Sequence, residues 1–262
     1  MSDEKLILQV NDLSIVFGGL KAVSELNMEL RKGELVGLIG PNGAGKTTMF
    51  NMVSGIYTPT SGQLSYWDRE NKVHVINKAN PAQLNKLGIA RTFQNIRLFG
   101  NLTVLDNVRI ALHNSRISNP LDVLFRTSHF RRDEQIMTEK VMQLLSLFKI
   151  DGKCRELAKN LPYGEQRKLE IVRALASNPK LLLLDEPAAG MNPQETHELM
   201  EMIAFIRREF NLTILLIEHD MKLVMGICER IMVLNYGKII ASGTPEEIKS
   251  NPQVIKAYLG GE

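Results

Sequence analysis

A glycine-rich run, GPNGAGKT, occupies residues 40–47 and matches the phosphate-loop pattern G-x-x-x-x-G-K-[ST]. In such loops the glycines let backbone N–H groups surround phosphate oxygens, the lysine reaches the terminal phosphates, and the next hydroxyl ligates Mg²⁺. A purely structural glycine-rich turn is the weaker interpretation, because an apolar stretch precedes the run and a helix-forming stretch follows it. We therefore predict a site for a nucleoside triphosphate and Mg²⁺, with contacts from Gly40, Pro41, Asn42, Gly43, Ala44, Gly45, Lys46, Thr47 and Thr48, of which Thr47 ligates the metal.

An apolar run that ends in two acids, LLLLDEP, occupies residues 181–187. A carboxylate at the end of a strand beside a phosphate loop can hold Mg²⁺ through water, and here that carboxylate is Asp185. Glu186 follows it and is predicted to polarise the attacking water. Two acids after a strand are a weak signal alone, since solvated strand ends often carry acids. Together with the phosphate loop they predict hydrolysis of the nucleotide.

The run LIEHD, residues 216–220, places His219 at the end of another apolar stretch. A single histidine usually has a structural role. At the carboxyl ends of strands in an α/β sheet, where ligands gather, contact with the γ-phosphate is better supported. We therefore predict that His219 acts with Glu186 in catalysis.

The stretch LPYGEQRKLE, residues 161–170, contains a lone glycine, Gly164, before a helix-forming run rich in charges. A helix N-terminus after a loop can bind phosphate through its N–H groups. However, a proline and a tyrosine stand where such a loop would need small residues and hydrogen-bond donors. From these residues alone, a weakened phosphate-binding loop and an ordinary turn both stay open.

The composition is that of an ordinary globular protein. The chain has 262 residues, 44% hydrophobic and 23% charged, enough for one large domain or two intimate ones. The net charge of +3 is too small to indicate a nucleic acid partner. The two cysteines form no metal or disulfide pattern, which suits a reducing cytoplasm. Because no signal peptide and no apolar run of ~20 residues is present, we expect a soluble protein that reaches a membrane only through another protein.

Short apolar runs alternate with amphipathic stretches, the pattern of an α/β fold. Strands are expected over 6–10, 13–17 and 26–30, antiparallel to one another, and over 35–39, 62–67, 89–93, 181–184, 213–217 and 231–234. Helices are expected over about 103–112 and 131–148, from the charged run after Gly164 through 169–176, from Asn192, and as two short ones from Thr244 and Asn251; residues 114–130 are expected to form a loop or short helical insertion. The predicted domains are 1–95, 96–176 and 177–262, an α/β core that a helical segment interrupts.

The order of these motifs resembles the nucleotide-binding subunits of ATP-binding cassette (ABC) transporters over essentially the whole chain. The resemblance implies a phosphate-loop NTPase core of the RecA-like type, with an N-terminal antiparallel β subdomain and an inserted α-helical subdomain. It implies that Gln94, in RTFQ, senses the γ-phosphate, contributes to the Mg²⁺ site and faces a membrane subunit. It also implies that Phe17 is the aromatic residue that stacks on adenine. Without the resemblance, Phe17 would be assigned to the core.

In this family the loop at 161–165 is usually Leu-Ser-Gly-Gly-Gln/Glu and grips ATP that the opposite subunit holds. Leu161, Gly164 and Glu165 match it, so the resemblance assigns them to nucleotide binding. Pro162 has neither hydroxyl nor N–H, and Tyr163 adds a ring where glycine permits close approach. We therefore expect a weakened grip, and a heterodimer with a second cassette that carries a fuller signature.

Within the family, RTFQNIRLF, DEPAAGMNP and the tail NPQVIKAYLG resemble the ATPases of branched-chain amino acid import systems. This implies ATP and Mg²⁺ as cofactors, two transmembrane permease subunits, indirectly a periplasmic or extracellular amino-acid-binding protein, and a peripheral place on the cytoplasmic face of the inner or plasma membrane. Two alternatives are the same role in a urea or amide importer and a soluble ABC ATPase that acts on DNA or ribosomes. The third, a nucleotide kinase, leaves LPYGE and His219 unexplained.

Overall fold

The computed structural model describes residues 6–113 and 128–259. Contacts divide the chain into two compact units: a sheet unit, Met1–Gln94 with Lys180–Glu262, and a helical unit, Asn95–Pro179. The sequence placed the limits of the helical segment at 96 and 176. Of the expected insertion at 114–130, residues 114–127 lie outside the described part. Within the described part, no helix is both long and apolar enough to cross a membrane.

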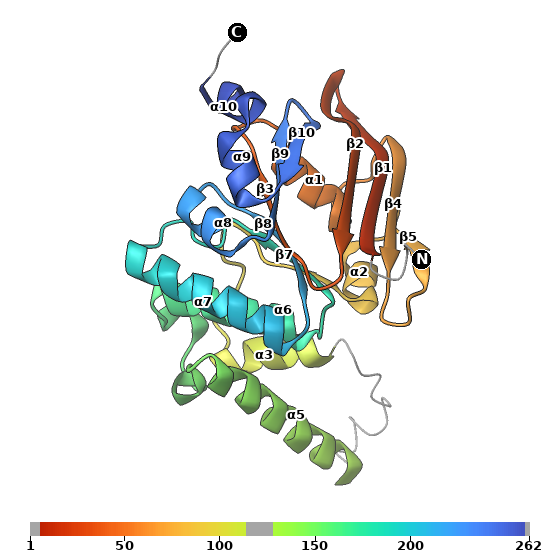
Figure 1. The fold of residues 1–262 in the computed structure, drawn as a ribbon. Coiled ribbons are helices and arrows are strands. Elements are labelled where there is room, and N and C mark those ends of the chain that lie inside the picture. Colours follow the sequence, from red (N-terminus) through yellow and green to blue (C-terminus); the bar gives the residue numbers. More distant parts are fainter. Residues whose placement is uncertain (1–5, 114–127, 260–262) are drawn as a thin grey trace. The chain divides into compact units, whose positions relative to one another are not determined.

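The first sheet of the sheet unit is antiparallel, with strand order β2-β1-β4-β5 (Figure 1). Its strands are β1 (Leu6–Phe17), β2 (Leu20–Arg31), β4 (Ser61–Trp67) and β5 (Val73–Val75). The antiparallel pairing of β1 with β2 confirms the expectation. The two separate strands expected over 6–17 are wrong, because β1 continues through a register shift at which Asp12 adopts a φ of 48°. An irregularity of this kind absorbs the polar break in the pattern.

The second sheet has the order β10-β9-β3-β8-β7-β6, parallel except for the antiparallel pair β9–β10. Its strands are β3 (Leu35–Ile39), β6 (Ile89–Arg91), β7 (Leu181–Asp185), β8 (Thr213–Ile217), β9 (Arg230–Asn235) and β10 (Lys238–Gly243). Every residue of β3, β7 and β8 is buried, which explains their continuous apolar sequences. Asp185 pairs in register with Ile217, and Leu38 pairs with Ile217 on the other side of β8, so the carboxyl ends of these strands share one edge.

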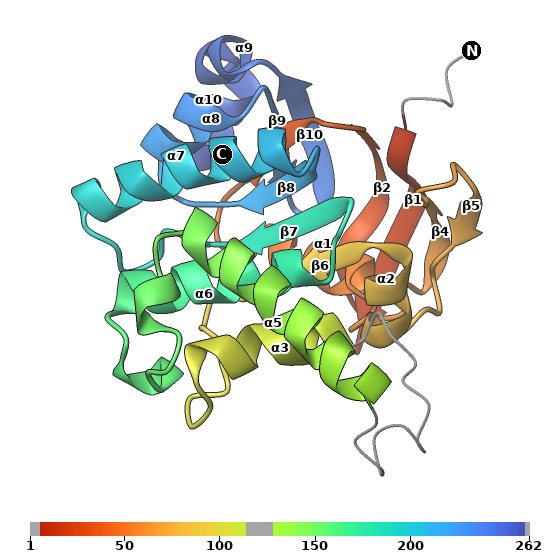
Figure 2. The same ribbon diagram turned by 90° about the horizontal axis from the view of Figure 1, so that it is seen from below.

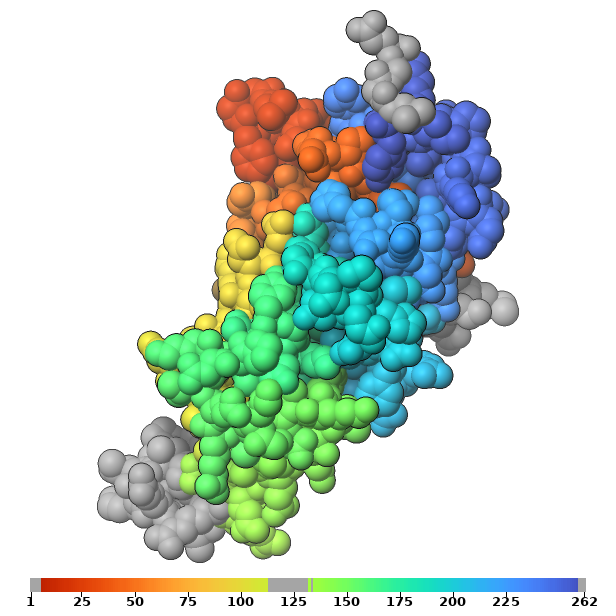
Figure 3. All heavy atoms as spheres, turned by 90° about the vertical axis from the view of Figure 1, so that its left-hand side faces the viewer, coloured from red at the N-terminus to blue at the C-terminus, as the bar shows by residue number. Residues whose placement is uncertain are grey.

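The helices of the sheet unit are α1 (Lys46–Val53), α2 (Pro81–Leu87), α7 (Pro193–Glu209), α8 (Met221–Ile227), α9 (Pro245–Ser250) and α10 (Pro252–Leu259). The expected cap of α7 is confirmed: Asn192 and Glu195 form a capping box. Asn80 and Gln83 form the same motif at α2, a helix that the sequence pattern did not reveal. Figure 3 shows α7 and α8, in cyan and blue, side by side on the surface of this unit.

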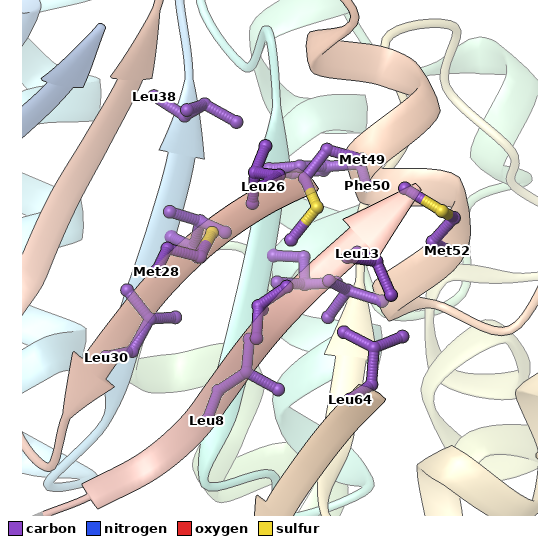
Figure 4. Close-up of a cluster of buried hydrophobic side chains, with 14 of the residues drawn as sticks. Leu8, Leu13, Leu26, Met28, Leu30, Leu38, Met49, Phe50, Met52 and Leu64 are labelled. Carbon is purple, nitrogen blue, oxygen red and sulfur yellow. The ribbon is translucent and has the colours of Figure 1, made fainter. Parts of the chain in front are cut away.

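The core of the sheet unit fixes the first turn of α1. Met49, Phe50 and Met52 are buried among side chains of both sheets, including Leu13 and Leu26 (Figure 4). Burial of a side chain of this size is worth about 1.5–3 kcal/mol. The helix that carries Lys46 is therefore anchored by the residues that follow it.

The helical unit contains α3 (Val104–His113), α5 (Ser128–Leu147) and α6 (Tyr163–Ala176), with short 3₁₀ turns over Asp151–Lys153 and Ala158–Asn160. The three helices contact one another pairwise (Figure 2). The cap of α3 is confirmed, since Asp106 N donates to Thr103 Oγ1 over 3.1 Å. α5 begins at Ser128, three residues before the expected start at about 131 and inside the segment expected to be a loop or short helical insertion. Thr127, of a type favoured as an N-cap, directly precedes this boundary in the sequence, but no Glu or Gln follows three residues later, so the helix start was poorly defined by the pattern.

Candidate active site

The loop between β3 and α1 takes a shape that only glycine permits at two positions. Gly45 has a φ of +105°, and a Cβ there would lie 2.7 Å from the carbonyl oxygen of Ala22. A Cβ at Gly40 would overlap the carbonyl oxygen of Leu234. The loop is also tied to the β9–β10 turn, where Gly237 N donates to Ala44 O over 2.9 Å. Backbone on both sides thus holds the loop at the N-terminus of α1, the arrangement that binds phosphate.

Lys46 lies under this loop. Its Nζ donates to the carbonyl oxygens of Gly40 (2.7 Å) and Pro41 (2.9 Å), and the residue is buried. Burial lowers the pKa of Lys46, and the Glu186 carboxylate opposes that shift. The ammonium group is thus held close to the loop whose phosphate contacts the sequence predicts.

A cavity of about 510 Å³ opens over the loop and falls within the usual range for small-molecule sites. Its lining confirms that much of the predicted set converges in the sheet unit. The lining residues are Phe17, Leu20, Lys21, Ala22, Asn42, Gly43, Ala44, Gly45, Lys46, Thr47, Thr48, Glu186, His219 and Tyr236.

The predicted catalytic carboxylate lies between two polar side chains. Gln94 Nε2 donates to Glu186 Oε2 over 2.6 Å, and His219 Nε2 lies 2.8 Å from Glu186 Oε1. Because a carboxylate only accepts, the histidine proton is at Nε2 in this contact. Glu186 itself has a φ of 47°, a conformation that L residues seldom adopt outside constrained sites. The structure thus brings Gln94, Glu186 and His219 together, as the predicted roles require.

Asp185, at the end of β7, is buried and paired with Arg91, a residue that the sequence interpretation missed. Arg91 Nη2 donates to Asp185 Oδ2 over 2.6 Å, and the side chains are each only 7% exposed. The available signal was a basic residue at the end of β6, three positions before Gln94. Its sequence neighbours, Ala90 and Thr92, gave no indication that its side chain would pair with Asp185.

Glu218 is a second residue that the sequence interpretation missed. It is buried and accepts backbone N–H bonds from Ala188 (2.6 Å) and His219 (3.0 Å). Burial raises the pKa of Glu218, while the backbone donors act in the opposite direction. This carboxyl joins the segment after Glu186 to the segment that carries His219, so it supports the two residues predicted to act in catalysis.

Two aromatic residues flank the cavity. Phe17, the predicted adenine contact, is partly exposed, and its ring meets Tyr57 edge-on at a centroid distance of 5.3 Å. Tyr236, which was not predicted, is 87% exposed and has a φ of 45° in the β9–β10 turn. The cavity therefore has aromatic surface suited to a base as well as polar groups suited to phosphates.

Three predicted nucleotide contacts belong to the helical unit. Leu161 is buried, Gly164 lies in the first turn of α6, and Glu165 pairs with Lys153 Nζ at 2.6 Å. Pro162 is the N-cap of α6 and makes no side-chain cap. The structure therefore shows a helix N-terminus at this loop, and the predicted contacts to ATP stay predictions.

The donor set suits Mg²⁺ bound together with phosphates. No cluster of three or more His, Cys, Asp or Glu that could hold a metal occurs among the residues described. Mg²⁺ is usually held by one or two carboxylates together with substrate phosphates rather than by a protein cage. Thr47 and Asp185 provide oxygen donors of the preferred type, so the residues present fit the metal.

A phosphate loop after a buried parallel strand, with an Asp-Glu pair and a histidine at the same sheet edge, defines the class of phosphate-loop ATPases. The chain belongs to the ABC transporter family, whose model, described as "ABC transporter", matches residues 23–189. A second model, "Branched-chain amino acid ATP-binding cassette transporter", matches residues 238–262.

Similar proteins cover nearly the whole length of the chain. The high-affinity branched-chain amino acid transport ATP-binding protein LivG of Escherichia coli strain K12 is 47% identical over 97% of this chain and 98% of its own. The corresponding protein BraF of Pseudomonas aeruginosa is 46% identical with the same coverage. A solved ATP-binding cassette of an ABC transporter in its ADP conformation has a TM-score of 0.82 and 32% identity, with 98% of this chain and 99% of that chain covered. The predicted family and fold class are confirmed.

Proposed function

We propose that this chain is the ATP-hydrolysing subunit of an ABC importer that takes up branched-chain amino acids. The observation that carries the solute class is the likeness to LivG and BraF along 97% of the chain, together with the family model over residues 238–262. The cavity above the phosphate loop and the three side chains around Glu186 support the chemistry.

Each side chain has a definite part in this proposal. The loop amides and Lys46 bind the phosphates, and Phe17 stacks on the adenine ring. Bound Mg²⁺, held by Thr47 and Asp185 with Gln94 nearby, would neutralise charge on the phosphate oxygens. Glu186 takes the proton from the attacking water, which makes it the general base. His219 keeps that carboxylate in place and contacts the γ-phosphate.

The partners follow from the transport role. We propose two permease subunits, a second cassette, and an amino-acid-binding protein that acts through the permease, with this chain on the cytoplasmic face of the membrane. The helical unit is the proposed docking element, and half-exposed Phe99, with the Arg173 guanidinium 5.7 Å from its ring, belongs to that surface. A contribution of Phe99 to the core of the helical unit is the alternative.

The second cassette is proposed to be a different chain. Leu161, Gly164 and Glu165 would face ATP that the partner holds, but Pro162 and Tyr163 reduce the donors at this loop. Two identical copies would then have two weak sites. A partner with a fuller signature would close over this chain's Lys46, Asp185 and Glu186 and make that site the faster one.

The test is reconstitution. The chain is co-expressed and co-purified with candidate permease subunits and a candidate second cassette from the same genome, inserted into vesicles, and supplied with an amino-acid-binding protein. ATP hydrolysis stimulated by leucine, isoleucine or valine, with uptake of the labelled amino acid, is the expected result. Stimulation by urea or short amides alone would assign the chain to the related importers. Hydrolysis without any association with permeases would favour a soluble ABC ATPase.

A further inference from the structure

Arg91 connects three functional parts of the sheet unit. Its Nη1 donates to Asn51 Oδ1 and to Ser54 Oγ, both at 2.7 Å, and these residues belong to α1 or follow directly after it. Its Nη2 donates to Asp185 Oδ2 at 2.6 Å. Arg91 itself ends β6, the strand that leads to Gln94. One guanidinium thus contacts the phosphate-loop helix, the strand of the metal carboxylate and the strand that precedes the γ-phosphate sensor.

The guanidinium is fixed independently of Asp185. Besides the two bonds to α1, it lies 5.6 Å from the centre of the Phe50 ring and 5.0 Å from that of Phe93. A planar cation held by two hydrogen bonds and two aromatic rings has little freedom to follow a mobile partner. The Asp185 carboxylate therefore adopts the orientation that Arg91 imposes on it.

The pair is also buried. Both side chains are 7% exposed, so solvent screens their attraction little, and removing either partner would leave the other buried without its hydrogen bond. The contact takes Oδ2, one of the two carboxylate oxygens. Residues outside a metal site commonly tune it in this way: they hydrogen-bond one atom of a ligand and thereby orient the atom that contacts the metal.

We propose that Arg91 is a positioning residue for Mg²⁺ in this cassette: it holds Asp185 through Oδ2 in a single orientation, ready to ligate the metal. The inference rests on the proposed Mg·ATP site and adds a residue to it. A purely structural role, in which Arg91 only joins α1 to β6 and β7, makes a different prediction, because the fold would then change and the metal dependence would not.

The experiment measures the affinity of the full chain for a fluorescent ATP analogue, once in EDTA and once in Mg²⁺. The quantity of interest is the metal enhancement, the ratio of the two dissociation constants. In Arg91→Met the affinity in EDTA is expected to stay within about twofold of wild type, while the enhancement falls by about 10-fold or more, the usual cost of losing an outer partner of a metal ligand. Arg208→Met, which removes an exposed arginine of α7, is the matched control and should change neither value.

A double-mutant cycle with Asp185→Asn separates positioning from packing. If Arg91 acts through Asp185, adding Arg91→Met to Asp185→Asn lowers the enhancement by no more than about twofold further, since the partner is already gone. Melting in EDTA provides a reading without metal: Arg91→Met, which leaves a buried carboxylate unpaired, lowers the unfolding temperature, and Asp185→Asn in the same chain recovers part of it.

Three results would overturn the proposal: an unchanged metal enhancement in folded Arg91→Met, a parallel loss of affinity in EDTA and in Mg²⁺, or full additivity with Asp185→Asn. If Arg91→Met does not fold, Arg91→Lys decides. A lysine keeps the charge but lacks the planar fork whose two nitrogens reach Asp185 and α1 separately, so an enhancement equal to that of wild type would exclude the role. A wild-type chain without any metal enhancement would instead refute the Mg·ATP site itself.

Discussion

The phosphate loop and the loop at 161–162 each lead into a helix N-terminus, yet they are built differently. The first enters α1 through glycines at positive φ, among them Gly40 and Gly45, and is enclosed by the backbones of β2 and β9. The second enters α6 through Pro162, at φ −55° and ψ 153°, with no side-chain cap. In the first loop, glycine backbone at positive φ determines the conformation. In the second loop, the pyrrolidine ring of Pro162 restricts it.

The difference also extends to the side chains that follow each loop. α1 begins with Lys46, which is held close to the loop, and Thr47 and Thr48 line the cavity. α6 begins with Tyr163, whose hydroxyl accepts from Arg167 over 3.3 Å, and Glu165 is engaged by Lys153. A helix N-terminus attracts anions in both places. Only at the first loop is the helix N-terminus combined with N–H groups on a glycine backbone and with a lysine, Lys46, whose ammonium group is bonded to the loop itself.

The largest effect is expected from Glu186→Gln. All proposed hydrolytic groups belong to the sheet unit, and the amide cannot take a proton from water. ATP binding should persist while hydrolysis in the assembled transporter slows by about 10²–10⁴-fold, the range for loss of a general base. Single-turnover hydrolysis measures it, with Glu209→Gln on the exposed end of α7 as the control. Near-normal turnover would remove Glu186 from that role.

A matched pair of glycine substitutions tests the contrast in backbone shape. Gly45→Ala places a Cβ 2.7 Å from Ala22 O in a left-handed backbone, so nucleotide binding should be lost and the chain destabilised by about 1–3 kcal/mol. Gly164→Ala lies in the first turn of α6 and should stabilise the isolated chain by up to about 1 kcal/mol. Urea unfolding and nucleotide titration measure both. Equal effects would mean that the two loops do not differ in this way.

Restoring the donors of the second loop should bring the two loops closer together. Pro162→Ser supplies a backbone N–H and a hydroxyl cap for α6, and Tyr163→Gly allows closer approach. Each donor regained on a charged phosphate is worth about 1.5–3 kcal/mol, or roughly tenfold or more in rate. The measurement is hydrolysis by the transporter with the catalytic glutamate of one cassette inactivated at a time. In wild type the two sites are expected to hydrolyse ATP at unequal rates, and in the variant these rates should become more equal. Equal rates in wild type would show that Pro162 and Tyr163 have no effect.

The smallest predicted effect concerns two buried carboxylates. In the helical unit Glu170 is paired with Arg167 at 2.7 Å, whereas Glu218 of the sheet unit has backbone donors and a pKa raised by burial. A raised pKa means that the folded chain binds the proton more tightly than the unfolded chain does. The free energy of unfolding should therefore fall as pH rises from the ordinary carboxyl range through the raised pKa. The fall amounts to about 1.4 kcal/mol for each tenfold difference in proton affinity between the folded and unfolded chains.

Glu218→Gln should lack that slope, since an amide does not titrate. Urea unfolding of the wild type and the variant between about pH 4 and pH 8 compares the two, and the stability of wild type relative to the variant should be greatest at the acid end. A constant difference across this range would show that Glu218 does not titrate in a perturbed environment.

The sequence predicted the parts whose chemistry is local. The glycines of GPNGAGKT specify the loop conformation locally. Fully buried strands such as β7 and β8 have almost continuous apolar sequences. The cap at Thr103 and the capping box at Asn192 likewise use residues three positions apart, so periodicity and residue type suffice. The resemblance to ABC transporters then added roles for Gln94 and Phe17, which residue types alone would not assign.

What the sequence did not reveal depends on distant neighbours. Arg91 gains its importance from Asp185, and Glu218 from the backbone N–H of Ala188, and neither spacing forms a motif. β1 continues through a polar break because it pairs with β2 on one edge and with β4 on the other. The alternation of polar and apolar residues does not predict this continuation. Tyr236 occupies a left-handed position where asparagine or glycine would be expected, so residue type gave no warning of its conformation.

The strand order of the six-stranded sheet governs when nucleotide binding can arise during synthesis. β3 leaves the ribosome early, but its partners β8 and β9 are translated only after the entire helical unit, and the Gly237 contact that holds the phosphate loop comes later still. Until then the apolar β3 has no neighbour in its sheet, a situation that slows folding and exposes a chain to aggregation. The helical unit is a continuous segment, 95–179, with its own internal contacts, so it can collapse first. Nascent chains halted before β8 should therefore lack affinity for ATP, and chaperone demand should be highest in that interval.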